Sequence, residues 1–237
     1  MNYEASLSQT RFGPLDKRDI GGLAWRGEYL YATEPSEKGF NGIWVFEAAR
    51  WWPDQKPSYK IDLTGKPKVG RIAADSQGNP WVVQGNDVVH FKLENGAELA
   101  RVTLAPPAMP AALVVDHLDR MLVADRGPDS DIKLFDAAGK PVGTVGAEGG
   151  HRAGPVPGLI GPLRFDKPSG LAIDASKNLY VYSAGGAWPQ TVRLESYAWD
   201  GNAWSKLNWK SEGLVGGDSV FIDPGDETRS ERCLHCG

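Results

Sequence analysis

The chain has 237 residues, of which 41% are hydrophobic, which is enough for the core of one large β domain or two small ones. A net charge of −4 without a long Lys/Arg block argues against a nucleic-acid partner, and no apolar run approaches the roughly 18 residues of a membrane span. The two cysteines, Cys233 and Cys236, lie at the extreme C-terminus, so disulfides do not hold this fold together.

Residues 1–18 are expected to form an N-terminal strand or extension, and a first repeated unit begins near Asp19. The unit that begins near Val69 shows the repeated order most plainly. A short apolar strand ends near Asp75, a polar turn follows, and two further apolar strands lie at 81–83 and 88–91. The dipeptide Asn95-Gly96 then predicts a turn into a fourth strand at 99–102.

The same order recurs from about Met109 and from about Lys167, and a weaker fifth unit begins near Val215. The residues at the end of each first strand are spaced 49, 41, 58 and 49 apart; they are Arg26, Asp75, Asp116, Asp174 and Asp223. Periods of about 40–50 residues with four strands each are typical of propeller blades. No segment shows a convincing helical period of apolar residues.

The pattern therefore predicts an all-β fold, a β-propeller of four-stranded antiparallel blades over residues 19–225, with five blades or an incomplete six. A β-sandwich is the alternative, but it does not explain the periodic order of turns. We expect small residues on the first strands, such as Gly22 and Gly70, to suit a crowded axis. Residues 226–237 are expected to be a tail, disordered or cut short.

The segment VADRGPDSDIKLFDAAGKPVGTVGAEGG, from Val123 to Gly150, resembles the centre of an NHL repeat, and PLRFDKPSGLAIDASKNLYV, from Pro162 to Val181, resembles the junction to the next repeat. A more distant likeness is to gluconolactonase and regucalcin-type propellers. The resemblance implies a propeller fold and, because many bacterial NHL-like proteins are exported, favours an extracellular or periplasmic parent protein. It says little about activity, since propellers host many unrelated functions.

The repeated aspartate at the strand ends is predicted to be structural, because an aspartate there accepts hydrogen bonds from the backbone N–H groups of the following turn. Among the tryptophans, Trp25, Trp44 and Trp81 are expected in the core. Trp199 and Trp204 are expected to flank a hairpin turn.

Ligand-binding residues are predicted in the loops that follow the second strands: Glu34, Arg126 and Trp188. Arg126 could hold a carboxylate or a phosphate in bidentate fashion, and Trp188 could stack on a ring. The neighbouring Asp125, Asp129 and Asp131 are instead interpreted as a solvated, self-paired cluster.

We therefore predict a scaffold that binds a protein or a small-molecule ligand on one propeller face, with no cofactor, metal, nucleic acid or membrane. The alternative is a metal-dependent hydrolase or lyase of the gluconolactonase type, with carboxylates at the central channel, although the metal-binding set of that family cannot be placed here. The Cys-x-x-Cys pair of Cys233 and Cys236 is half a zinc site at most.

Overall fold

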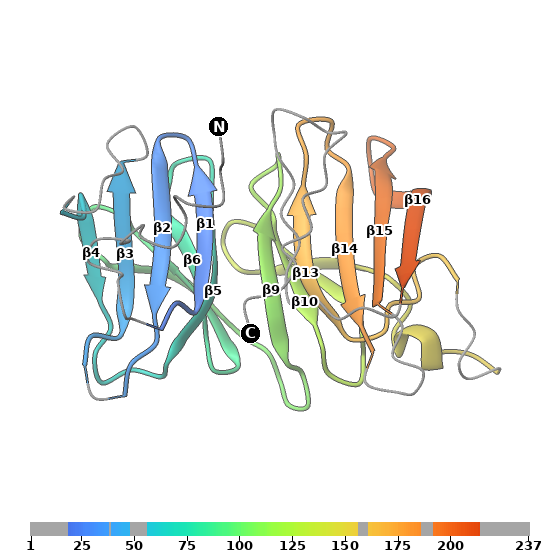
Figure 1. Cartoon of the computed structure of the whole chain (residues 1–237), viewed down its shortest axis with the longest axis horizontal. Coiled ribbons are helices and arrows are strands. Elements are labelled where there is room, and N and C mark those ends of the chain that lie inside the picture. Colours follow the sequence, from blue (N-terminus) through green and yellow to red (C-terminus); the bar gives the residue numbers. More distant parts are fainter. Residues whose placement is uncertain (1–18, 38, 48–55, 156–160, 186–191, 214–237) are drawn as a thin grey trace, which may run out of the picture. The chain divides into compact units, whose positions relative to one another are not determined.

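The structure is a computed structural model that describes residues 19–37, 39–47, 56–155, 161–185 and 192–213. These residues form four antiparallel sheets of four strands each, and the strands of every sheet follow one another in chain order (Figure 1). The chain divides into two compact units, residues 1–85 with 89–99, and residues 86–88 with 100–237.

The first unit holds the first sheet and most of the second, whose final strand runs into the second unit. The strands are β1 (Gly22–Arg26), β2 (Tyr29–Glu34), β3 (Gly42–Glu47), β4 (Tyr59–Asp62), β5 (Val69–Ala74), β6 (Pro80–Gln84), β7 (Asp87–Phe91) and β8 (Glu98–Thr103).

One apolar core joins the two sheets of this unit, with Tyr31, Ile43 and Val45 from the first and Ile72, Val82 and Val89 from the second. The first strands approach closely, because a Cβ added to Gly22 would lie 2.9 Å from the Cα of Arg71. Only glycine fits β1 at that point.

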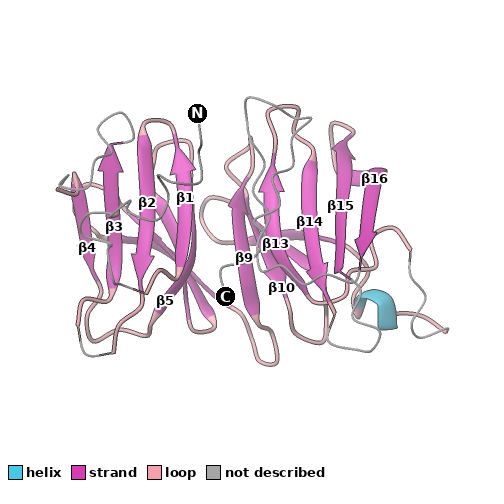
Figure 2. Ribbon diagram, viewed as in Figure 1, coloured by secondary structure: helices cyan, strands magenta, loops and turns pink. Residues whose placement is uncertain are grey.

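The second unit holds β9 (Pro110–Val115), β10 (Met121–Asp125), β11 (Ile132–Phe135), β12 (Pro141–Val145), β13 (Pro168–Ile173), β14 (Leu179–Ala184), β15 (Val192–Trp199) and β16 (Trp204–Gly213). Its core also lies between two sheets, with Leu122 and Ile132 from one and Leu179, Val181 and Tyr197 from the other. Pairing inside each sheet is antiparallel, as a meander requires (Figure 2).

Helix is almost absent from the described part of the chain, where the short 3₁₀ segment η5 (Gly150–Arg152) is drawn cyan in Figure 2. None of the described segments is a helix long and apolar enough to cross a membrane.

The predicted all-β architecture of four-stranded antiparallel sheets is confirmed. The expected N-terminal extension, the fifth unit from Val215 and the tail lie outside the described residues, so these expectations stay predictions.

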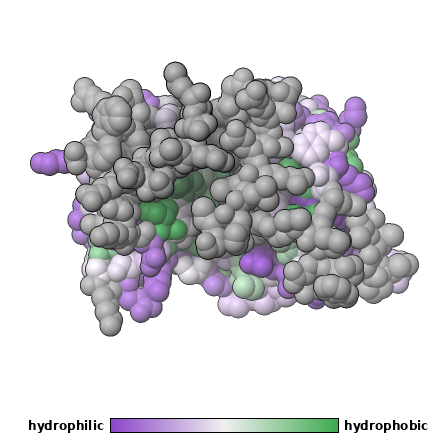
Figure 3. Space-filling model, viewed as in Figure 1, coloured by the Kyte–Doolittle hydropathy of each residue, from purple (hydrophilic) through white to green (hydrophobic). Residues whose placement is uncertain are grey.

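The tryptophan prediction was partly wrong. Trp81 is fully buried, but Trp25 is 60% exposed, because alternation along β1 turns it and Leu23 away from the core that the first two sheets share. Figure 3 shows hydrophobic surface, drawn green, near the position of β1.

Candidate binding site

The second strand of each sheet carries a buried polar residue at or near its end. These residues are Glu34 on β2, Gln84 on β6, Asp125 on β10 and Ser183 on β14. The chain then turns through a loop into the third strand of the sheet. This edge is where the sequence places its candidate ligand-binding residues, and its chemistry differs from sheet to sheet.

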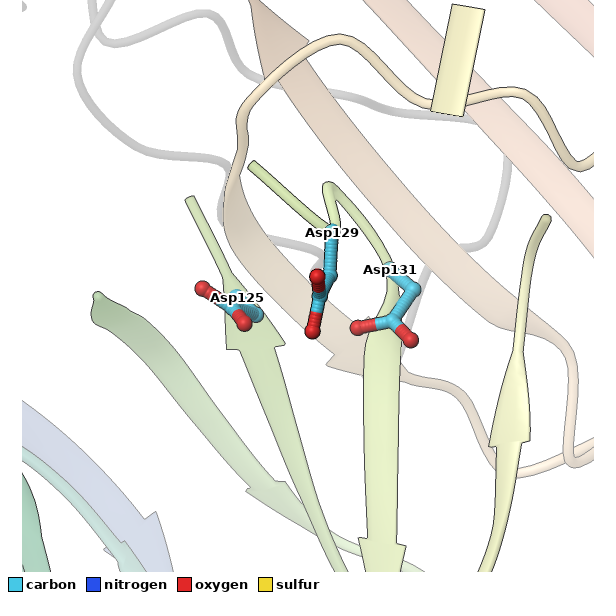
Figure 4. Close-up of side chains that lie close together, drawn as sticks. All are labelled: Asp125, Asp129 and Asp131. Carbon is cyan, nitrogen blue, oxygen red and sulfur yellow. The ribbon is translucent and has the colours of Figure 1, made fainter. Parts of the chain in front are cut away.

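In the third sheet, three carboxylates surround one ammonium group. Asp125 ends β10, Asp129 lies in the loop and Asp131 precedes β11, and Figure 4 shows the three side chains close together. The Lys133 Nζ lies 2.8 Å from Asp129, 3.1 Å from Asp131 and 3.4 Å from Asp125. We call these four residues the lysine cluster.

Burial, hydrogen bonds and neighbouring charges together set the pKa values in the lysine cluster. Burial raises the pKa of Asp131 above its ordinary value, although Lys133 opposes this. Burial alone would lower the pKa of Lys133, but its hydrogen bonds to Asp129 and Asp131 and the charges of Asp131 and Asp125 raise it. The ammonium group therefore stays charged and acts as the counterion of this loop.

The three carboxylates also have the spacing of a metal site, since one oxygen of each lies within 4.8 Å of the others. A divalent cation would have to displace the Lys133 ammonium, which already contacts all three carboxylates. The donor set fits Ca²⁺ or Mg²⁺ by type, but the Lys133 ammonium already contacts all three carboxylates and would compete with the ion.

Hydrogen bonds and a close backbone contact also fix the backbone of this loop. Asp125 Oδ1 accepts hydrogen bonds from the N–H groups of Met109, at 2.8 Å, and Gly127, at 2.7 Å. A Cβ added to Gly127 would lie 2.6 Å from the carbonyl oxygen of Pro107, so this position requires glycine. The result is a tight loop whose frame is buried.

Arg126 is the exposed charge on this loop, and it makes no ion pair with any residue in the described ranges. Its backbone N–H donates to the carbonyl oxygen of Met109 at 2.9 Å. The backbone of Arg126 is therefore fixed while the residue is exposed, which is compatible with the predicted binding role.

Glu34 lies at the end of β2, whereas the sequence interpretation placed it in a loop. Its side chain is buried and accepts a hydrogen bond of 2.8 Å from the Trp44 indole N–H. Glu34 belongs to the first unit and Arg126 to the second. Trp188 lies outside the described residues.

The structural role predicted for the repeated aspartate is confirmed for the three described positions. Asp75 Oδ1 accepts from the N–H groups of Gln77 and Asn79, and Asp116 and Asp174 accept equivalent bonds from their own turns. Burial would raise the pKa of Asp75, but hydrogen bonds from His90 and Asn79 outweigh it and hold that pKa below its ordinary value.

In the fourth sheet, a buried ion pair takes the place of the lysine cluster. Arg193 Nη2 lies 2.6 Å from Glu195 Oε1, which also accepts a 3.0 Å hydrogen bond from the Tyr197 hydroxyl. Arg193 also donates to the carbonyl oxygen of Arg164, and the N–H of Leu163 donates to the Tyr197 hydroxyl. We call Arg193, Glu195 and Tyr197 the arginine network; it ties the segment 161–165 to β15.

A second titratable pair lies beside this segment. His151 Nδ1 is 3.1 Å from Asp166 Oδ1, and both side chains are partly exposed. The Asp166 carboxylate sits against the backbone of Gly185, where a Cβ would lie 1.5 Å from Oδ2. Loop residues and strand ends of the fourth sheet thus meet in a polar region.

Sequence reasoning missed the roles of Lys133, Arg193 and Glu195. Lys133 and Arg193 alternate with apolar neighbours in a strand, a pattern that normally indicates a solvent-facing side chain. One signal of an ion pair was present in the sequence. Asp131 and Lys133 are two residues apart, and in an extended strand this spacing places their opposite charges on one face.

No protein-family model and no curated protein sequence matches the chain. Solved structures do match in fold. A structural-genomics protein of unknown function from Bacteroides thetaiotaomicron is similar with a TM-score of 0.58 at 16% identity, over 77% of this chain and 46% of that one.

A catalytically inactive virginiamycin B lyase from Staphylococcus aureus, solved with quinupristin, gives a TM-score of 0.57 at 14% identity, over 89% of this chain and 62% of that one. The β-propeller domain of Cps50 (Swd1) from Myceliophteria thermophila gives 0.54 at 12% identity, over 83% of this chain and 59% of that one. The chain thus spans less than two thirds of the length of each. At such identities the likeness shows the fold alone, and that fold is a β-propeller.

Proposed function

We propose that this β-propeller chain is an NHL-like scaffold that binds a ligand or a protein through the loops after the second strands of its blades. The observation that carries the proposal is the loop from Asp125 to Asp131, whose frame is buried and hydrogen-bonded while Arg126 stays exposed. A pre-formed loop that presents one charged side chain loses little conformational entropy on binding.

Arg126 sets the chemistry of the proposed ligand. A guanidinium offers a planar set of donors that matches a carboxylate or a phosphate in bidentate fashion. We therefore expect an anionic group on the small molecule or protein that this loop receives. Glu34 and Trp188, the other two residues predicted from the sequence, are proposed as binding residues of their own sheets. Glu34 is the weaker candidate, because one of its oxygens already accepts from Trp44.

The proposal is tested by thermal shift with phosphate, citrate and an acidic peptide as probes, for the wild type and Arg126→Ala. At least one probe is expected to raise the Tm of the wild type and to have a clearly smaller effect on the variant. Lys140→Ala, at an exposed residue of the same sheet, serves as the matched control. Equal Tm shifts in the wild type and in Arg126→Ala would show that Arg126 is not part of the binding site.

The alternative function, a metal-dependent hydrolase or lyase, would draw its carboxylates from Asp125, Asp129 and Asp131. The Lys133 ammonium between them opposes it, because a cation there would compete with a charge already in place. Similarity to a lyase supports this alternative only at the level of the fold. A millimolar Ca²⁺ or Mg²⁺ titration that raises the Tm of the wild type by several degrees would favour the alternative.

A further inference from the structure

Two buried side-chain oxygen atoms of the fourth sheet are without a hydrogen-bond partner among the described residues. They are the hydroxyl of Ser183 on β14 and the Oε2 of Glu195 on β15, and both residues are at most 1% exposed. A buried hydroxyl or carboxylate oxygen without a partner loses its hydration and gains nothing in return. In folded proteins such atoms usually mark an ordered water or a bound group.

The strand register places the two side chains together. Ser183 pairs with Arg193, and Val181 pairs with Glu195. Cross-strand partners share a face, and so do residues two apart, so Ser183 and Glu195 are diagonal neighbours on one face of the sheet. Diagonal positions lie about 7–8 Å apart, within reach of one bridging water when one side chain is long.

The side chains around Ser183 and Glu195 determine what kind of group can bridge them. Glu195 Oε2 can only accept when the group is ionised, while a serine hydroxyl can both donate and accept. A bound cation is disfavoured, because the Arg193 guanidinium already lies 2.6 Å from the other oxygen of Glu195. A neutral oxygen that donates to Glu195 and exchanges a hydrogen bond with Ser183 satisfies both atoms.

We propose that one internal water bridges the Ser183 hydroxyl and Glu195 Oε2 and completes the arginine network. Oε1 of Glu195 then accepts from Arg193 and Tyr197, and Oε2 accepts from the water. Through Arg193 and Tyr197 the same network holds the backbone of Arg164 and Leu163. The water is therefore part of the attachment between the segment 161–165 and the fourth sheet.

The first test asks whether the variant Ser183→Ala has a lower Tm than the wild type. If the water is present, Ser183→Ala removes one of its partners and lowers the Tm by about 2–4 °C, as the loss of about one hydrogen bond does in a protein of this size. If Ser183 is truly unsatisfied, the same change removes a desolvated hydroxyl and leaves the Tm unchanged or raised. Ser211→Ala, at an exposed serine on β16 of the same sheet, is the matched control and is expected to change little.

The second test does not depend on a variant that folds. A high-resolution crystal structure of the wild-type chain is expected to show a water within hydrogen-bond distance of both Ser183 Oγ and Glu195 Oε2. A protein group bonded to either atom in place of water would overturn the proposal, and so would a Ser183→Ala variant with an undiminished Tm.

Discussion

The lysine cluster and the arginine network solve the same problem in two neighbouring sheets of the second unit. In each, a basic side chain from the third strand of the sheet pairs with buried carboxylates. In the lysine cluster, one flexible ammonium reaches three carboxylates, and one of these, Asp129, is 41% exposed. In the arginine network, both charges are at most 2% exposed and the partners are fixed in direction.

The difference shows what each arrangement is suited to. An ammonium on a flexible stem is a point charge that tolerates small movements of its partners, whereas a guanidinium binds in a fixed planar geometry. The lysine cluster therefore holds a loop that also presents Arg126 outward. The arginine network holds the segment 161–165 against the sheet and has no exposed charge of its own.

The largest effect is expected for the arginine network. Arg193→Met leaves Glu195 buried without its cation and is expected to cost about 3–5 kcal/mol of the free energy of unfolding. The double variant Arg193→Met with Glu195→Leu removes both charges and should recover most of that loss. Urea denaturation measures the free energy of unfolding of both variants. A double variant as unstable as the single one would show that the pair stabilises the fold by more than neutralising each other's charge.

A smaller effect is expected for Lys133→Met, about 2–3 kcal/mol, because this lysine is a fifth exposed and water partly replaces it. Millimolar Ca²⁺ should raise the Tm of this variant more than that of the wild type, since the three carboxylates then lack an ammonium partner. Equal Ca²⁺ shifts in the two proteins would contradict the counterion role of Lys133.

The pH dependence distinguishes one carboxylate within the lysine cluster. Burial raises the pKa of Asp131 in the folded state, so its ionised form carries a penalty at neutral pH. That penalty is relieved as the pH falls through the raised folded value toward the unfolded value of about 3.9. The wild type should therefore gain stability relative to Asp131→Asn as the pH is lowered from 7 to 4, as measured by urea unfolding. A constant difference between the two proteins over this range would be evidence against a raised pKa.

The smallest effect is expected for Asp129→Asn, below about 1 kcal/mol, because its contact with Lys133 is an ion pair near the surface. Its backbone carbonyl oxygen, which accepts from the N–H of Gly149, is unchanged by the substitution. A chemical denaturation series in low and high salt checks this. A loss as large as that of Lys133→Met would mean that the cluster acts as one unit.

The sequence predicts the sheets far better than it predicts these polar sites. The turn residues recur from sheet to sheet, and so do the aspartates Asp75, Asp116 and Asp174. This repetition allows the strands and turns to be predicted from the sequence. Lys133 and Arg193 both stand second in the third strand of a sheet, but the first two sheets have Ile43 and Val88 there, and a charged residue in an alternating strand normally faces water. Their burial depends on loops folded over them, such as 161–165, and strand periodicity does not contain that information.

The loop from Asp125 to Asp131 combines a frame that tolerates little change with two exposed positions, Arg126 and Pro128. Gly127 between them is fixed by the approach of Pro107. The two outward positions can therefore be diversified in a library while the blade beneath them is left intact. In that sense this small stretch is a natural place to graft new specificity onto the scaffold.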